Sequence, residues 1–554
     1  EIMKITFCGA AESVTGSCHL VTTKNYKILL DCGQFQGNKE TEAKNLEEFP
    51  FDPSEVDFML LSHAHIDHSG RIPLLIKKGF RGTIYSTDAT ADLLKVMLMD
   101  SAYIHEQEAE WQSRKNLRAG KAPAEPLYTC KDAETALQFV SPVLYGQYLE
   151  LAPGIHAVFN DAGHILGSSI IELFIDEGEG ETKLVFSGDL GVKGRPILRD
   201  PTVIKKADYL IMETTYGNRA RDKGGDRIET LIDIVAKTVK RGGNVIIPCF
   251  AVGRTQELIF EFNRYYEEHT QYKELLDHVP FYVDSPMATS VTEVFRRNAQ
   301  VFDDETKEYI LKGDNPLDFK NLKFTRSSEE SRFLNMDSTP KIILSASGMC
   351  EAGRIKHHLK HNLWDAKNSI VFVGYQAEGT LGRSLAQGDK DVTIFGEKIH
   401  VNAEIYNLEG FSGHADRDGL LEWLGSFEKK PVAVFLVHGE PEAKKTFASS
   451  AKMALGCNCI PITAVSEYEL SKDALLSSRE IKKNFTEKEA EVHEIRQRTA
   501  AVHRQMEQIL YNANLAIDEK TPSKKLKTLQ NYLLELEKST MNFGSALIQE
   551  EPEE

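Results

Sequence analysis

The chain has 554 residues and a formal net charge of −17, with 41% hydrophobic and 27% charged residues. Because a single core rarely grows beyond about 250–300 residues, this length predicts two large domains and an appendage. The acidic balance argues against a nucleic-acid-binding surface over the whole molecule, but it allows a local basic groove or metal ions that bind phosphate.

Short apolar runs alternate with turns and helical stretches from residue 3 to about residue 208. Buried strands are predicted at 27–31, 57–61 and 183–187, and a long helical region between 88 and 131. A second series of strands alternates with helices such as 255–266, which is typical of a mostly parallel α/β sheet. The strands of this second series are predicted at 209–212, 244–247, 341–344 and 369–373. A final strand at 432–437 follows a helix at 417–425.

The last ninety or so residues have a different pattern. Apolar residues recur in steps of three and four from Val492 to Ala516, and again from Leu526 to Leu547. This heptad spacing predicts two helices joined by a turn at 521–523, that is, a C-terminal helical hairpin. The alternative is an apolar stripe that forms a homodimer or binds a protein partner.

Three histidines and an aspartate lie within six positions, directly after the strand predicted at 57–61. They are His63, His65, Asp67 and His68. Desolvated imidazoles need partners, and a divalent cation can supply the compensation for a cluster of them. Two histidines one residue apart can reach one metal ion from a loop, and Asp67 and His68 indicate a second ion.

This H-x-H-x-D-H pattern resembles the metal-binding signature of the metallo-β-lactamase superfamily. His164, Asp189 and Asp31 follow predicted strands, in the order that this superfamily requires. The resemblance implies two Zn²⁺ ions, with manganese or iron as alternatives. The implied ligands are His63, His65 and His164 for one ion, Asp67 and His68 for the other, Asp189 as the bridge, and Asp31 behind a ligand histidine.

The long segment after Asp189 resembles the nuclease insertion called β-CASP. Its three motifs are matched at Glu213, at His414 and at His438. Members that cut RNA carry histidine at the third motif, whereas DNA-cutting repair members tend to carry valine, so the resemblance favours RNA. It also implies that His438 joins Asp67 and His68 on the second zinc.

Glu213 and His414 form a plausible acid pair. A leaving 3′ oxygen is a poor leaving group unless it is protonated, so the resemblance assigns His414 as general acid and Glu213 as the carboxylate that favours its charged form. Asp67 completes the expected catalytic set. The alternative for His414 is a capping residue before the helix at 417–425.

These resemblances imply an α/β fold, an αββα metallo-β-lactamase sandwich with an inserted parallel α/β β-CASP domain and the C-terminal helical hairpin. The expected boundaries are 1–208 and 394–466 for the sandwich, 209–393 for the insertion and 467–554 for the helical extension.

Phosphate contacts are also expected in the inserted domain. The loop after the strand at 341–344 could meet an anionic oxygen with its backbone N–H groups, and three arginines follow glycine-containing turns, although each could be an ordinary surface arginine. The candidates are Ser347, Gly348, Met349, Arg254, Arg354 and Arg383. His357, His358 and His361 are interpreted as a solvated basic helix face rather than a third metal site.

The resemblance as a whole implies a zinc-dependent ribonuclease acting on single-stranded RNA, similar to the cleavage-and-polyadenylation endonucleases and their prokaryotic relatives. The alternatives are a ribonuclease J-like 5′-exonuclease, an inactive scaffold and a hydrolase of a substrate other than nucleic acid. No run of about 18 apolar residues is present, so we expect no membrane span. Eight scattered cysteines without a C-x-x-C pair predict reduced thiols in a cytoplasmic protein.

Overall fold

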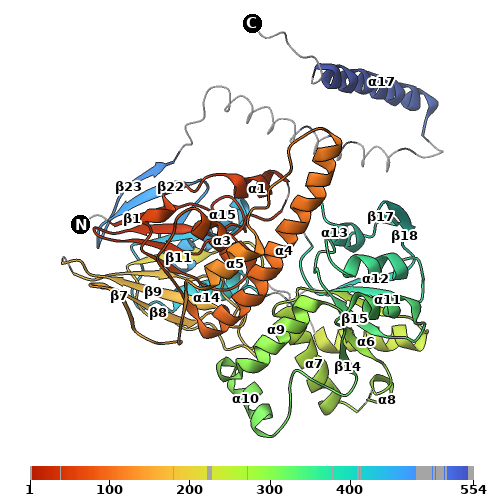
Figure 1. Cartoon of the computed structure of the whole chain (residues 1–554), viewed down its shortest axis with the longest axis horizontal. Helices are drawn as coiled ribbons and strands as arrows, with labels where there is room; N and C mark the ends of the chain where they lie inside the picture. Colours follow the sequence, from red (N-terminus) through yellow and green to blue (C-terminus); the bar gives the residue numbers. More distant parts are fainter. Residues whose placement is uncertain are drawn as a thin grey trace. The chain divides into compact units, whose positions relative to one another are not determined.

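The computed structural model describes residues 3–37, 39–178, 180–220, 227–270, 273–376, 379–408, 411, 413–481 and 521–546, with single positions at 502, 506, 509 and 517. The chain divides into two units, Glu1–Ile481 and Lys482–Glu554 (Figure 1). None of the helices in these ranges is long and apolar enough to cross a membrane.

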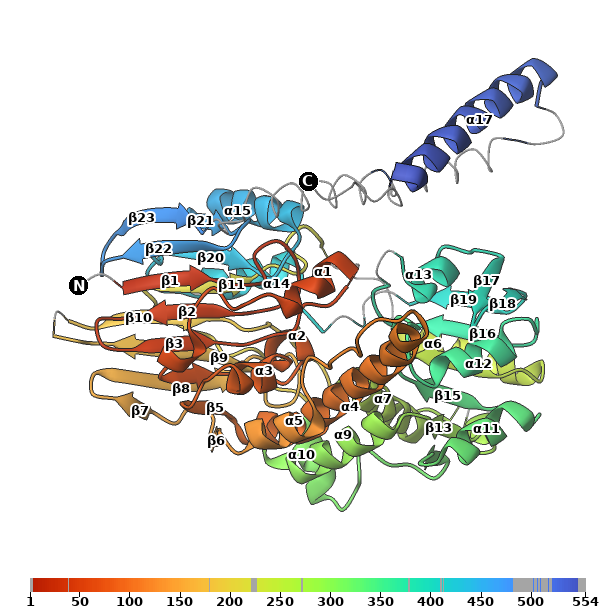
Figure 2. The ribbon, with the colours of Figure 1, turned by 45° about the horizontal axis from the view of Figure 1, so that its top comes forward.

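Two mixed sheets form the core of the first unit (Figure 2). The first sheet has eight strands, in the spatial order β23 (Leu475–Glu480), β22 (Ser466–Leu470), β1 (Met3–Phe7), β2 (His19–Thr22), β3 (Lys27–Leu30), β4 (Phe58–Leu60), β5 (Thr83–Thr87) and β6 (Val140–Val143). The second has seven, in the order β21 (Cys459–Pro461), β20 (Ala433–Val437), β11 (Tyr209–Glu213), β10 (Thr182–Phe186), β9 (Ser169–Ile175), β8 (Ile155–Asp161) and β7 (Leu149–Ala152).

Helices cover the outer faces of both sheets, which makes the αββα sandwich that the sequence predicted. Residues such as Ile28, Leu173 and Phe435 fill the space between the sheets. The helices of the first sheet are α1 (Lys39–Ala43), α2 (Ile66–Ser69), α3 (Ile72–Lys77), α4 (Asp88–Arg118) and α5 (Cys130–Leu137). Over the second sheet, α14 (Arg417–Gly425) and α15 (Pro441–Leu455) bury Trp423 and Phe447 against Met212.

The inserted domain is a parallel six-stranded sheet with helices on both faces. Its strands are, in spatial order, β14 (Leu322–Phe324), β13 (Phe281–Val283), β15 (Ile342–Ser345), β12 (Val245–Pro248), β16 (Ser369–Phe372) and β19 (Glu404–Asn407). Its helices are α6 (Arg227–Lys240), α7 (Arg254–Glu268), α8 (Lys273–Leu276), α9 (Pro286–Arg297), α10 (Asp304–Leu311), α11 (Ser328–Met336), α12 (Ile355–Asn362) and α13 (Leu381–Ala386). A separate hairpin, β17 (Asp391–Ile394) and β18 (Glu397–His400), precedes β19.

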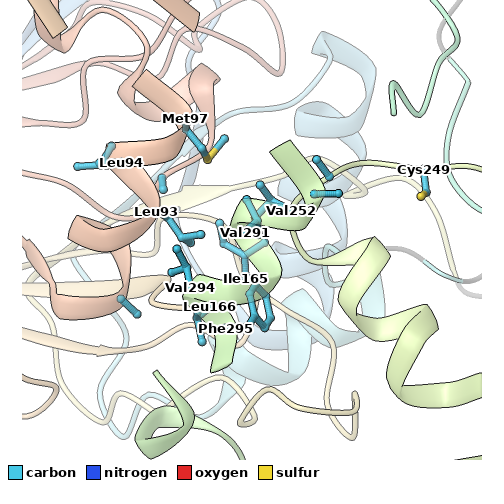
Figure 3. Close-up of a cluster of buried hydrophobic side chains, with 14 of the residues drawn as sticks. Leu93, Leu94, Met97, Ile165, Leu166, Cys249, Val252, Val291, Val294 and Phe295 are labelled. Atoms are coloured by element: carbon cyan, nitrogen blue, oxygen red, sulfur yellow. The ribbon is translucent and has the colours of Figure 1, made fainter. Parts of the chain in front are cut away.

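One continuous apolar core joins the inserted domain to the sandwich (Figure 3). Leu93 and Met97 of α4 lie on one side of it, and Val291 and Phe295 of α9 lie on the other. Ile165, next to the candidate ligand His164, is buried in the same core. Since large apolar side chains contribute about 1.5–3 kcal/mol each when fully buried, this core holds the two domains in one arrangement.

The structure corrects the expected domain boundaries in three places. β11 pairs with β10 and β20 and therefore belongs to the sandwich, not to the insertion that was expected to begin at 209. β19 pairs with β16, so the inserted sheet extends past the expected end at 393. β22 and β23 close the first sheet, where a helical extension was expected from 467. β19, β22 and β23 are short and largely polar, so they lack the buried apolar run that marks a strand in the sequence.

The second unit is described over one helix, α17 (Ser523–Ala546), which begins directly after Pro522. This helix confirms the second half of the predicted hairpin. The first half, predicted from Val492 to Ala516, lies outside the described residues apart from single positions.

Candidate metal centre

The candidate site lies at one edge of the sandwich, where several strands end. β3 and β4 run parallel to each other in the first sheet, and β10, β11 and β20 run parallel to one another in the second, so their carboxyl ends meet at this edge. The loops that follow them carry Asp31, the histidine run beginning at His63, Asp189 and His438, and β11 ends on Glu213. His164 arrives from the turn after β8.

The first group of side chains consists of three histidines and an aspartate. The Nε2 atoms of His63 and His164 lie 3.2 and 3.3 Å from Nδ1 of His65. The same Nε2 atoms lie 3.6 and 3.7 Å from Oδ2 of Asp189. All four ligand atoms lie within 4.8 Å of one another, which is the spacing of donors around one metal ion.

The second group consists of Asp67, His68 and His438, which also offer three ligand atoms within 4.8 Å. Nε2 of His68 lies 3.0 Å from Nε2 of His438 and 3.3 Å from Oδ2 of Asp189. Oδ2 of Asp67 lies 3.3 Å from Nε2 of His438. Asp189 therefore lies beside both groups, as the bridging role requires.

The donor set and its surroundings fit bound cations. Oδ1 of Asp189 is buried and has no hydrogen-bond partner among the described residues, and such an orphaned acceptor is costly unless a cation faces it. Burial holds the pKa of His63 and of His164 well below 6.5, and it lowers the pKa of His65 to about 4. These imidazoles are therefore neutral at pH 7, the form that binds zinc.

Asp31 fixes the orientation of His68. Its Oδ2 accepts a hydrogen bond from Nδ1 of His68 at 2.6 Å, which leaves Nε2 to face the second group. The backbone N–H and the hydroxyl of Ser62 donate to the same carboxylate. A carboxylate behind a ligand histidine sets the ring tautomer and raises its basicity.

Two of the site residues have strained backbone. Asp31 has a φ of 59° and His438 a φ of 50°, a region that non-glycine residues rarely adopt and that is retained mainly at functional sites. Beside them, Gly33 packs so closely on the loop of Asp67 that a Cβ atom would lie 1.6 Å from the Asp67 carbonyl oxygen.

His414 and Glu213 lie together next to the first group. Nδ1 of His414 is 3.3 Å from Oε1 of Glu213, and its ring centroid is 4.5 Å from that of His164. Burial lowers the pKa of His414, but the carboxylates of Glu213 and Asp189 outweigh it and raise the pKa to about 9. The imidazolium form therefore persists at neutral pH, as a general acid needs.

A buried charge network, which no sequence pattern indicated, connects this site to the inserted domain. Arg195 donates to the carbonyl oxygens of His164 at 3.2 Å and Gly413 at 3.3 Å, and it forms an ion pair of 2.6 Å with Glu257 on α7. Nδ1 of His164 donates to the same Gly413 carbonyl at 2.8 Å. Arg254 also pairs with Glu257. Arg195 lies in an irregular loop without a motif, so sequence reasoning missed it.

The expected phosphate contacts have different surroundings. Arg254 is buried against Glu257, and Arg354 pairs with Asp284 at 2.7 Å. Arg383 lies at the start of α13, where Gly382 N–H donates to the Met349 carbonyl, and its buried Nε has no partner among the described residues. The loop at Ser347, Gly348 and Met349 ends well before α12 begins at Ile355, so its amides do not belong to the first turn of that helix.

The interpretation of His357, His358 and His361 as a solvated face is wrong for His358. That residue is fully buried and hydrogen-bonded to Asp284 and Asn335, whereas His357 and His361 are exposed. The reason is the helical period, because His358 shares the inner face of α12 with Ile355 and Leu359.

Fold and site together define a metallo-hydrolase of the metallo-β-lactamase superfamily. Family profiles match in three places: the metallo-beta-lactamase superfamily domain at residues 20–187, the Beta-Casp domain at 255–385, and the Zn-dependent metallo-hydrolase RNA specificity domain at 398–463.

Relatives match along most of the chain. A ribonuclease of Thermus thermophilus is 40% identical over 79% of this chain and 94% of its own length. The transcription termination factors FttA of Methanocaldococcus jannaschii and Methanosarcina mazei are 32% and 33% identical over 81% of this chain, and over 69% and 68% of their own lengths. The chain therefore belongs to the β-CASP ribonuclease family of this superfamily.

Proposed function

We propose that this protein is a zinc-dependent ribonuclease that hydrolyses phosphodiester bonds of single-stranded RNA. The observation that carries the proposal is the pair of ligand groups around Asp189 with the acid pair His414–Glu213 beside them. Of the similar proteins, the Thermus thermophilus ribonuclease matches over nearly its whole length, whereas the FttA factors extend well beyond the match. The Thermus thermophilus ribonuclease is therefore the better basis for proposing the activity of this chain.

Each side chain of the site has a distinct part in this reaction. One zinc would be held by His63, His65 and His164, the other by Asp67, His68 and His438, and Asp189 would contact both. When bound, such a pair of ions supplies a water nucleophile with a lowered pKa and neutralises charge on the phosphoryl group. Asp31 keeps Nε2 of His68 turned toward its group through the bond to Nδ1.

His414 would protonate the leaving 3′ oxygen. Its Nδ1 faces Glu213, so Nε2 is the nitrogen that would carry the proton to the leaving group. Glu213 itself is held by the backbone N–H of Leu190, at 2.6 Å from Oε1, so the pair is oriented before substrate arrives. A positioned general acid contributes about 10²–10⁴-fold to such a step.

The inserted domain would hold the RNA backbone. The loop at 347–349 and Arg383 form the best-supported contact, because Gly382, directly before Arg383, donates its backbone N–H to the Met349 carbonyl. The buried Nε of Arg383 has no partner among the described residues. Ser347 N–H already donates to the Ala352 carbonyl, so Gly348 and Met349 supply the amides that would meet a phosphate oxygen.

The decisive experiment measures cleavage of labelled single-stranded RNA and of matching DNA by the wild type and by His414→Ala, with zinc content determined in both. We expect the wild type to cut RNA and spare DNA, and the variant to lose about 10²–10⁴-fold in kcat with both zinc ions retained. Intact RNA from a fully zinc-loaded wild type would refute the proposal. Product ends and lengths would separate internal cleavage from a 5′-exonuclease mode.

A further inference from the structure

The second half of α4 leaves the core of the first unit. Up to Ala102 the helix buries nine of its side chains, but beyond it only Ala109 is buried. In Figures 1 and 2, α4 runs from the sandwich across toward the side of the inserted domain. With a rise of about 1.5 Å per residue, the stretch from Tyr103 to Arg118 forms an arm of roughly 22 Å.

The arm starts beside the candidate metal centre. Nε2 of His105 lies 3.3 Å from Oε1 of Gln34, and the backbone N–H of Gln34 donates to the carbonyl of Ile66 in α2. α2 carries Asp67 and His68. A strand that leaves the site on this side would therefore meet the arm within a few nucleotides.

The end of the arm has a local excess of basic residues. The chain has a net charge of −17, yet residues 111–121 contain Arg114, Lys115, Arg118 and Lys121 and no acid. Three glutamates precede this stretch on the arm, and one of them, Glu110, forms an ion pair of 2.6 Å with Arg114. Both partners of this pair are exposed, so it contributes little and a phosphate can replace the carboxylate. Trp111, which begins this stretch, is 57% exposed, and Tyr103, at the start of the arm, is 56% exposed. Nζ of Lys115 lies 3.4 Å from the centroid of the Trp111 ring.

The exposed aromatic and basic side chains also share one face. Tyr103, Gln107, Trp111, Arg114 and Arg118 follow one another at spacings of three and four residues, which places them in one stripe. The stripe lies opposite Ala102 and Ala109, which are buried. Cations in the last turn also stabilise the helix dipole, but that explains neither the exposed tryptophan nor Lys121 beyond the helix.

We propose that this stripe is a binding surface for single-stranded RNA outside the catalytic cleft. Bases would stack on Trp111 and Tyr103, and Arg114 and Arg118 would contact phosphates, the combination by which proteins hold single strands without reading their sequence. The inference rests on the proposed ribonuclease function and extends it, because it assigns a second RNA contact to a helix of the sandwich rather than to the inserted domain.

The test compares two substrates with the full-length, zinc-loaded protein: a single-stranded RNA of about 30 nucleotides and one of about five, too short to span the cleft and the arm together. The variants are Trp111→Ala and the double variant Arg114→Gln/Arg118→Gln, which keep good helix formers in place. Trp364→Ala is the matched control, because Trp364 is 58% exposed but lies in the inserted domain, between α12 and β16, and not on α4.

For the long RNA we expect KM to rise about tenfold in Trp111→Ala, with kcat unchanged, because stacking of a base contributes on this scale. In the double variant the slope of log(kcat/KM) against log[salt] should fall by about 1.4, since each lost phosphate contact contributes about 0.7. Both arm variants should cleave the short RNA with wild-type kinetics. Trp364→Ala should cleave both substrates with wild-type kinetics.

Three outcomes separate the hypotheses. A loss confined to the long RNA supports the stripe as an RNA surface. Wild-type kinetics of both arm variants on both substrates would overturn it and assign the stripe to a protein partner. If the wild type cleaves neither RNA, the ribonuclease proposal fails. Photo-crosslinking of 4-thiouridine RNA then tests RNA binding by the stripe independently of cleavage. Crosslinks at 103–121 support the RNA-binding surface, and crosslinks elsewhere overturn it.

Discussion

Replacing Arg195 by methionine removes the connection between the metal centre and the inserted domain. The side chains of Arg195 and Glu257 are only 8% and 11% exposed, and their ion pair is 2.6 Å long. Breaking a buried pair costs about 3–5 kcal/mol when it leaves a charge without a partner. Here Arg254 still faces Glu257, so the loss from the ion pair should be nearer 1–2 kcal/mol.

The lost hydrogen bonds of Arg195 add to this effect. Its guanidinium donates to the carbonyl oxygens of His164 and Gly413, and each such bond contributes roughly 1 kcal/mol. We therefore expect Arg195→Met to lower the free energy of unfolding by about 3–4 kcal/mol. Because His164 shares the Gly413 carbonyl and His414 follows it, kcat for RNA should fall at least about tenfold through misplacement of the acid.

Urea unfolding of the zinc-loaded proteins measures the change in the free energy of unfolding. The double variant Arg195→Met/Glu257→Gln should be less destabilised than the two single variants added together, because the residues share one ion pair. Lys193→Met is the control: its pair with Glu422 is exposed, so we expect a change of about 0–1 kcal/mol. Additive single variants, or an Arg195→Met protein as stable as Lys193→Met, would refute the reasoning.

Three further predictions concern single residues. Asp31→Ala should weaken zinc binding about 10–100-fold in equilibrium dialysis, since the short hydrogen bond that orients the ring of His68 would be lost; unchanged affinity would contradict that role. His438→Val should lower the zinc content from two ions toward one, measured by elemental analysis, and retention of both ions would exclude His438 as a ligand. Lys444 is fully buried, and burial lowers its pKa to about 8, so the unfolded chain holds this proton more firmly. The free energy of unfolding of the wild type, relative to that of Lys444→Met, should therefore rise by up to roughly 3 kcal/mol between pH 8 and 10.5. A difference between the two proteins that does not change with pH in thermal melts would show that the pKa is not lowered.

The parts of the fold that could be predicted from the sequence are those with a local signal. The predicted strand at 57–61 and the histidine run after it appear as β4 and the loop into α2 because both depend on consecutive residues. The helix predicted at 255–266 is found as α7 for the same reason. The positions of Asp31 and Asp189 after strand ends could be predicted because a buried apolar run lies shortly before each of them.

The parts that could not be predicted depend on partners far away in the chain. β22 pairs with β1 across more than 450 residues, and its sequence, Ser-Glu-Tyr-Glu-Leu, has no continuous apolar run. β11 is buried on both faces, so its sequence alone does not tell which of two sheets it joins. Arg195 acquires its role only when Glu257 and Gly413 are brought to it by the insertion.

The metal centre and the inserted domain are rigidly connected by packing and by hydrogen bonds. His164 is followed by Ile165 and Leu166, which are buried in the core shared with Val294 and Phe295 of α9, and the carbonyl that orients its ring is held by Arg195 against α7. A ligand of the first group is thus placed by packing from the insertion as well as by the sandwich. Since catalysis on a bound strand needs the phosphate contacts and the metals in register to within about 1 Å, a rigid connection of this kind serves the chemistry directly, and a hinge at this junction would not.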